Sequence, residues 1–213
     1  PHATRSIQRT MSDPVIRRVL DFWFSDGAMD QPTIDSRMDR WFTADPVFDA
    51  LIRQEFASLV DRASKGTLNN WAEEPEGRLA LILLLDQFRR NIHRGTPRAF
   101  SRDAQAVKLC VEGAATGAYK KLTPLQQAFY FMPLQHAESL RIQQRSVKIY
   151  EGMLAGVSET LKATFATFAQ FAALHHDIIA AHGRFPHRNR ILGRPDTPDE
   201  AAYLESAGPT FGQ

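Results

Sequence analysis

Apolar residues recur along most of this chain at the three- and four-residue spacing of amphipathic α-helices. The clearest pattern spans residues 46–63, where apolar side chains return to one face at every turn. Residues 75–92 are apolar on all sides in their middle, which predicts a central buried helix. We find no convincing segment with the period-two alternation of a half-buried strand. The pattern therefore predicts an all-α fold.

Prolines mark the beginnings of the predicted helices. Several follow Asp or Thr, which supplies an N-cap oxygen, while proline lacks the N–H that would be unsatisfied at the first helical position. These pairs are Asp13-Pro14, Asp45-Pro46, Thr96-Pro97, Thr123-Pro124 and Thr197-Pro198. Helices are predicted at residues 14–23, 32–42, 46–63, 75–92, 97–116, from 124 to a break at Pro133, through His136 and Glu138 to 154, at 158–182 and at 198–206.

Helices of these lengths joined by short loops predict antiparallel hairpins. Residues 13–213 are expected to form a single all-helical domain. Residues 1–12 are expected to be a disordered leader or an extraneous extension, because they show no helical periodicity.

Charge and composition narrow the classes of function. The net charge is +2, with the acidic excess before residue 86 and the basic excess after it. This charge is too small and too local for a nucleic-acid-binding surface of the usual kind. The longest apolar run falls far short of the roughly 20 residues that cross a bilayer. A single cysteine, Cys110, rules out an internal disulfide and fits a cytoplasmic protein.

A cationic loop at residues 183–194 is the most unusual polar stretch. It carries four arginines and one histidine, and it contains no acidic residue. Phe185, Ile191 and Leu192 give it apolar anchors. We therefore expect the loop to be ordered and to fold back on the preceding helices.

Asp86 follows directly after an apolar run that should be fully buried. An unpaired carboxylate is too costly there, so it must be paired, hydrogen-bonded or protonated. The expected partners are Arg90, Arg184 and Arg188. Two interpretations follow: either the pair only anchors the cationic loop, or Asp86 and the arginines line a pocket.

A second cationic stretch begins just after Asp86. Together with the loop it could hold a phosphate or carboxylate through bidentate hydrogen bonds. The predicted binding residues are Asp86, Arg89, Arg90, Asn91, Arg98, Arg184, His187, Arg188 and Asn189.

Histidines offer a possible acid–base pair. The candidates are His136, His175 and His187, with Glu138 or Asp86 as the carboxylate. We expect His175 to be a core histidine hydrogen-bonded to a carboxylate. Their spacing matches no standard zinc pattern, so no metal is expected, and the sequence lacks a phosphate-binding glycine loop and a nucleophile elbow, so no cofactor is expected.

Several motifs occur in an order typical of one family. They are Asp21-Phe22-Trp23-Phe24, Trp41-Phe42, Leu84-Leu85-Asp86-Gln87-Phe88-Arg89-Arg90-Asn91, Arg94-Gly95-Thr96-Pro97-Arg98-Ala99-Phe100, Pro133-Leu134-Gln135-His136-Ala137-Glu138 and the cationic loop. From residue 15 to 206 the chain resembles the bacterial family called domain of unknown function 924. The resemblance implies a tetratricopeptide-like, superhelical array of hairpins and no established reaction.

Three hypotheses remain for the function. The leading one is a tetratricopeptide-like module that binds an anionic small molecule or a peptide carboxylate in a groove lined by Arg and His. The second is a small cofactor-free enzyme with a histidine–carboxylate pair. The third is a protein–protein interaction module whose polar site only stabilises the fold. The sequence leaves the oligomeric state open.

Overall fold

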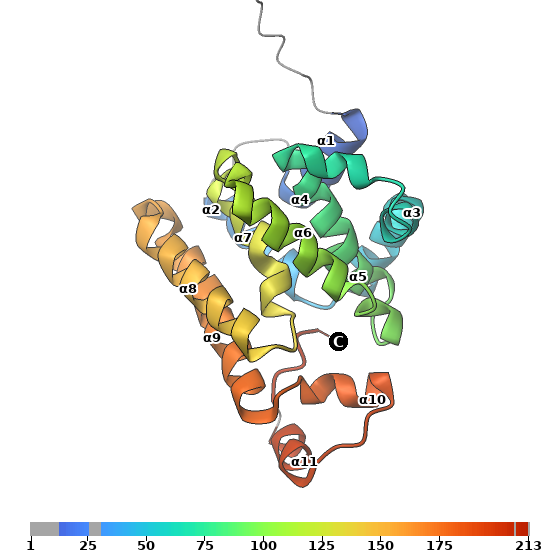
Figure 1. Ribbon diagram of the computed structural model, residues 1–213, viewed down its shortest axis with the longest axis vertical. Helices are drawn as coiled ribbons and strands as arrows, with labels where there is room; N and C mark the ends of the chain where they lie inside the picture. Colours follow the sequence, from blue (N-terminus) through green and yellow to red (C-terminus); the bar gives the residue numbers. More distant parts are fainter. Residues whose placement is uncertain (1–12, 26–30, 207, 213) are drawn as a thin grey trace, which may run out of the picture.

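The computed structural model describes residues 13–25, 31–206 and 208–212. The expected leader, residues 1–12, lies outside them. The described residues form helices and loops and no strand, so the predicted all-α class is confirmed (Figure 1). None of the described helices combines the length and apolarity needed to cross a membrane.

The first helices begin where the proline pairs place them. The side chain of Asp13 caps α1 by accepting from Val15 N, and Asp45 caps α3 by accepting from Val47 N. The first four α-helices are α1 (Pro14–Phe24), α2 (Gln31–Phe42), α3 (Pro46–Ser64) and α4 (Pro75–Leu83).

The central helical segment covers residues 75–92 as predicted, but its middle is not an α-helix. A π-helical turn, Leu84–Phe88, separates α4 from α5 (Arg89–Ile92). A π-turn inserts one extra residue per turn and therefore rotates the side chains that follow it. Asp86 lies in this turn and is fully buried.

Two other predicted helices are shorter than expected. The predicted start at Pro97 produces only a 3₁₀ turn, Pro97–Ala99, and α6 runs from Asp103–Thr116. Pro133 lies inside α7 (Pro124–Gln135), which ends two residues later. Residues 136–139 then form a loop before α8 (Leu140–Gly156), so the helix predicted through His136 and Glu138 was wrong at its start.

The C-terminal part of the described chain forms a long hairpin and two short helices. α8 packs against α9 (Lys162–His182), and the cationic loop follows, containing α10 (Asn189–Leu192), before α11 (Pro198–Glu205). Figure 1 shows α8 and α9 side by side on one flank, α10 and α11 at one end, and the C-terminal segment returning to the middle. The α-helix predicted from residue 158 begins only at Lys162, because the 3₁₀ turn Glu159–Leu161 precedes it.

The core is unusually aromatic. Trp23 contacts Phe88 and stands edge-on to Phe129, and Trp41 donates from Nε1 to Trp23 O at 3.1 Å. A smaller apolar cluster of Ile178, Ile179 and Phe185 lies under the cationic loop, with Tyr203 and Phe211 packed against it. The polar site described below lies where these two clusters meet.

Candidate functional site

A cavity of about 110 Å³ lies between α5, the end of α7, α9, the cationic loop and the C-terminal segment. Its polar wall consists of three arginines, three histidines and three amides: Arg90, Arg94, Arg188, His136, His175, His187, Gln87, Asn91 and Gln135. Its apolar wall is mainly aromatic: Trp41, Phe42, Phe100, Phe168, Phe171 and Phe211, with Met132. Among the described residues that line it, none is Asp or Glu.

Asp86 lies behind this wall and contacts three of its residues. Its Oδ1 accepts from Arg90 Nη1 at 2.6 Å and lies 2.7 Å from His136 Nδ1. Gln87 donates to Oδ2 at 2.9 Å. Burial alone would raise the pKa of Asp86, but the charge of Arg90 and the hydrogen bonds from His136 and Gln87 lower it to about 2. Asp86 is therefore ionised at neutral pH.

His136 presents a free basic nitrogen as a result. An ionised carboxylate only accepts hydrogen bonds, so Nδ1 of His136 carries the proton that points at Asp86. Nε2 is left with its lone pair, and no hydrogen-bond partner is recorded for it among the described residues. Burial lowers the pKa of His136, and so does Arg90, while Asp86 acts in the opposite direction. The imidazole is therefore neutral at pH 7.

A second carboxylate, Asp103, joins the two buried arginines. Arg90 donates to both its oxygens, at 2.9 and 2.8 Å, and Arg188 Nη1 lies 3.3 Å from Oδ2. Arg188 Nη2 also donates to the carbonyl of His136 at 3.0 Å. The guanidinium of Arg188 lies 4.5 Å from the ring centres of both Phe100 and Phe185. Each of these two contacts is a cation–π arrangement.

Arg188 is less well neutralised than Arg90. Its Nε is buried and has no hydrogen-bond partner among the described residues. Burial and the charge of Arg90 lower the pKa of Arg188 to about 10, so it stays protonated at neutral pH. The pKa of Arg90 is raised instead, because Asp103 and Asp86 outweigh the cost of its burial.

A third arginine–carboxylate pair joins Arg94, which lines the cavity, to Asp49. Arg94 donates to both oxygens of Asp49, at 2.6 and 2.9 Å, and Asn91 donates to Asp49 Oδ1 at 2.8 Å. Arg94 Nη1 also donates to the carbonyl of Gly212. The three carboxylates thus sit outside the cavity and the three guanidinium groups line it, so the wall has a positive face.

The other two histidines of the cavity are neutral. His175 donates from Nδ1 to the carbonyl of Phe171 at 2.6 Å, because a carbonyl can only accept. The prediction that His175 is a core residue is correct, but its partner is a backbone carbonyl and not a carboxylate. Burial, helped by nearby positive charge, lowers the pKa of both His175 and His187 to about 3.

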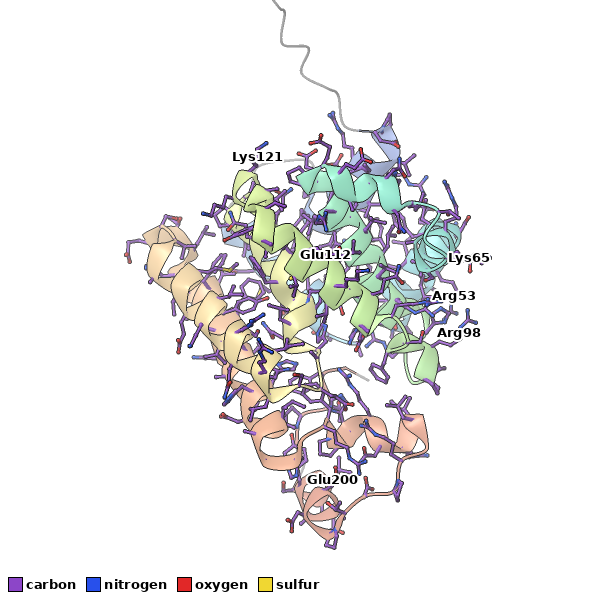
Figure 2. All side chains as sticks on the ribbon, viewed as in Figure 1. Arg53, Lys65, Arg98, Glu112, Lys121 and Glu200 are labelled. Atoms are coloured by element: carbon purple, nitrogen blue, oxygen red, sulfur yellow. The ribbon has the colours of Figure 1, made fainter. Side chains whose placement is uncertain are left out.

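Several predicted site residues do not reach the cavity. Arg89 turns away and bonds to Ser64, Ser101 and the carbonyl of Arg98. Arg98 is exposed, and Figure 2 shows it at the outer edge of the fold. Neither arginine therefore belongs to the anion-binding wall that the sequence predicts.

Carboxylates from outside the cationic loop pair with three of its arginines, Arg184, Arg188 and Arg194. Arg184 pairs with Glu200 at 2.6 Å, and Glu200 in turn closes the capping box of α11. Glu138 accepts from Arg194 at 2.7 and 2.9 Å and from the backbone N–H of Phe185. Those bonds lower the pKa of Glu138 despite its partial burial.

Asn189 also serves the loop. It donates to Asp196 at 2.7 Å and accepts from Arg194 at 2.8 Å. Arg184, Glu138 and Asn189 therefore hold the loop in place and do not line the cavity, whereas Arg188 and His187 do. Asp86 pairs with Arg90 among its three expected partners.

Some residues of the cavity were missing from the predicted site. Gln87 and Gln135 belong to the motifs quoted above and are the sequence neighbours of Asp86 and His136. That position could have identified both glutamines as site residues. Arg94 begins another of those motifs and was not among the predicted binding residues. Phe211 comes from a segment without helical periodicity, and no sequence signal connects it to the cavity.

The chemistry of the wall suits anions better than metals. The described residues contain no group of three or more His, Cys, Asp or Glu side chains that could hold a metal ion. Each carboxylate near the cavity is already bonded to an arginine.

Comparisons with known proteins agree on a family. The solved structure of a protein of unknown function from Agrobacterium tumefaciens is 32% identical, with a TM-score of 0.76, over 91% of this chain and 98% of that one. No curated protein matches the chain. The model of the family described as bacterial protein of unknown function (DUF924) matches residues 19–208. The chain therefore belongs to the DUF924 family of bacterial proteins of unknown function.

Proposed function

We propose that the cavity binds a small organic anion, with a carboxylate or phosphate at its arginine wall and an apolar body against its aromatic wall. The observation that carries this proposal is the polarity of the wall: three guanidinium groups line the cavity while their counter-ions Asp86, Asp103 and Asp49 lie behind them. Guanidinium groups with spare N–H donors are the protein's best ligands for carboxylates and phosphates.

The size of the cavity favours a small molecule over a peptide chain. An apolar cavity of about 150 Å³ holds benzene, and this one measures about 110 Å³. It therefore has room for a few heavy atoms in the present arrangement. A short carboxylic acid of that size would also match the mixture of charged and aromatic walls.

Arg188 offers the direct test. Arg188→Gln removes the least neutralised cation of the wall. We expect the affinity for a small acid to fall about 10- to 100-fold, because the loss of one hydrogen bond to a charged group weakens binding by about that factor. Arg184→Gln is the matched control, because it breaks an arginine–carboxylate pair of the same loop away from the cavity. The probes are acetate, pyruvate and inorganic phosphate, followed by ligand-observed NMR and calorimetry.

The stability of each variant decides how the result is interpreted. Thermal unfolding identifies a variant that has simply lost its fold, and Arg94→Gln then replaces Arg188→Gln as the second wall variant. Binding that is unchanged in both wall variants, or absent in the unmodified protein for all three probes, would contradict the proposal. The interaction-module hypothesis, with a purely structural polar site, would then be favoured.

Acid–base catalysis is a second candidate, and a specific contact supports it. Asp86 orients the Nδ1–H of His136, and the neutral imidazole lines the cavity. A bound 2-oxo acid would lose a proton from the carbon next to its carbonyl to Nε2 of His136. The same nitrogen would return a proton or, in D₂O, a deuteron, so no other reactant is needed.

Deuterium exchange measures this step. Pyruvate in D₂O should exchange its methyl protons faster with the protein than with buffer, and His136→Gln should remove the difference while pyruvate still binds. His176→Gln is the control, because His176 bonds to Asp177 on another face of α9. Exchange at the buffer rate with bound pyruvate would exclude catalysis of this kind.

The proposal also includes a tetratricopeptide-like arrangement of the hairpins, a cytoplasmic location and no nucleic-acid partner. The α8–α9 hairpin is consistent with a tetratricopeptide-like array, and a buried, unpaired Cys110 fits a cytoplasmic protein. The net charge of +2 gives no support to a nucleic-acid partner.

A further inference from the structure

The described C-terminal segment, residues 208–212, covers the cavity without belonging to a helix. Figure 1 shows it returning from α11 to the middle of the fold. Phe211 and Gly212 are both half-buried and both line the cavity. We call this segment the C-terminal strap.

The ring of Phe211 occupies a pocket made of other rings. It stacks on His175 with centres 4.0 Å apart and planes 23° apart. It also stands edge-on to His187 at 5.4 Å and to Phe185 at 6.3 Å. Because His175 and His187 are neutral, this pocket receives an aromatic ring without a charge to desolvate.

The next residue contacts the arginine wall. Gly212 presents its carbonyl oxygen to Arg94 Nη1. The strap therefore stacks the ring of Phe211 on His175 and places the carbonyl oxygen of the next residue at Arg94. A ligand in the cavity would contact the same two side chains. A neutral carbonyl is a weaker partner for a guanidinium group than a carboxylate.

The strap is held loosely compared with the rest of the site. Within the described residues, a single hydrogen bond joins the strap to the rest of the chain, from Arg94 to the carbonyl of Gly212. Phe211 has a φ of +51°, in the left-handed region that costs a non-glycine residue conformational energy. Both features lower the cost of displacing the strap.

We infer that the strap occupies the subsite of an aromatic carboxylic acid, which displaces Phe211 and Gly212 when it binds. The aromatic group of the ligand stacks on His175, and its carboxylate replaces the Gly212 carbonyl on Arg94. This inference rests on the proposed anion-binding function and adds the chemical class of the ligand and a competing segment of the chain itself.

Phe211→Ala in the full chain tests the inference. The variant empties the ring pocket, so the affinity for phenylacetate and 3-phenylpropanoate should rise, by about tenfold if the strap fills the subsite nine-tenths of the time. The affinity for acetate should change less than about twofold on the same reasoning, because acetate needs no ring pocket. Thr210→Ala is the matched control, since Thr210 belongs to the strap and is exposed.

The outcomes separate this inference from the proposed function. Acetate binding with unchanged or weaker binding of the aromatic acids to Phe211→Ala would overturn the inference alone, because Phe211 would then be part of the wall. No binding of any acid to any variant would overturn the proposed function and the inference together. Phe211→Leu provides a second variant that keeps an apolar side chain and loses the stacking on His175.

Discussion

The Nδ1 atom of His136 lies 2.7 Å from Oδ1 of Asp86, although 50 positions separate the two residues. Asp86 comes from the π-turn Leu84–Phe88, and His136 follows the last residue of α7. The contact joins the central helix to the end of α7 and fixes the imidazole at the cavity. Arg90 completes the arrangement from the next turn of the same helix.

Asp86→Asn should destabilise the protein strongly. The change leaves Arg90 with one carboxylate and removes the charge that His136 faces, and breaking a buried ion pair costs about 3–5 kcal/mol. Urea unfolding followed by circular dichroism measures the loss. Asp61→Asn is the control, because Asp61 pairs with Lys65 on the exposed surface and its removal should change the unfolding free energy little. Equal effects of both changes would show that burial is irrelevant here.

Acid should destabilise the protein partly through Asp86. Its pKa is lowered to about 2 in the folded protein, against about 3.9 when unfolded. The stabilisation is therefore complete above about pH 4 and is lost as the pH falls towards 2, where the folded state must also take up the proton. Urea unfolding free energies between pH 5 and 2 should fall less steeply for Asp86→Asn than for the unmodified protein. Parallel curves would contradict the assignment.

His175 and His187 should not titrate near neutrality. Burial lowers the pKa of each to about 3, so neither ring gains a proton between pH 8 and pH 5. The ring carbon and proton shifts of both residues in an NMR titration should stay constant over that range. Assignments come from His175→Gln and His187→Gln spectra. A midpoint near 6.5 for either ring would show that the cavity is more hydrated than this structure indicates.

Two helical glycines should respond oppositely to alanine. A Cβ on Gly77 would come within 2.2 Å of the backbone oxygen of Trp71, whereas a Cβ on Gly152 would meet nothing within 4 Å. Gly77→Ala should destabilise the fold by about 1–3 kcal/mol through overpacking. Gly152→Ala should stabilise it by about 0.5–1 kcal/mol through helix propensity. Thermal unfolding of the two variants measures both signs, and stabilisation by Gly77→Ala would contradict the close packing of α4.

Local signals in the sequence predicted most of the helices. An Asp or Thr before proline placed the starts of α1, α3, α7 and α11 correctly, because capping depends on atoms two or three residues away. The same signal at Thr96 produced only a 3₁₀ turn. The π-turn was not predicted, since an extra residue in a helical turn leaves the apolar pattern around it almost unchanged.

The sequence predicted the candidate site only in part, because local signals do not show which distant residues meet. A carboxylate after a buried run must have a partner, and Arg90 was available four residues away on the same helix. The choice among distant partners depended on packing. Arg184 reached Glu200 in α11, Arg188 reached Asp103 in α6, and His136 took the remaining place beside Asp86.

The sequence by itself determined the all-helical class, most helix boundaries and the need for buried counter-ions, because these follow from periodicity, capping and the cost of an unpaired charge. The tertiary structure alone decided which charges meet, where a cavity remains and what covers it. Those features depend on how α5, α7, α9 and the C-terminal strap pack together, and no local pattern encodes the contact of Phe211 with His175.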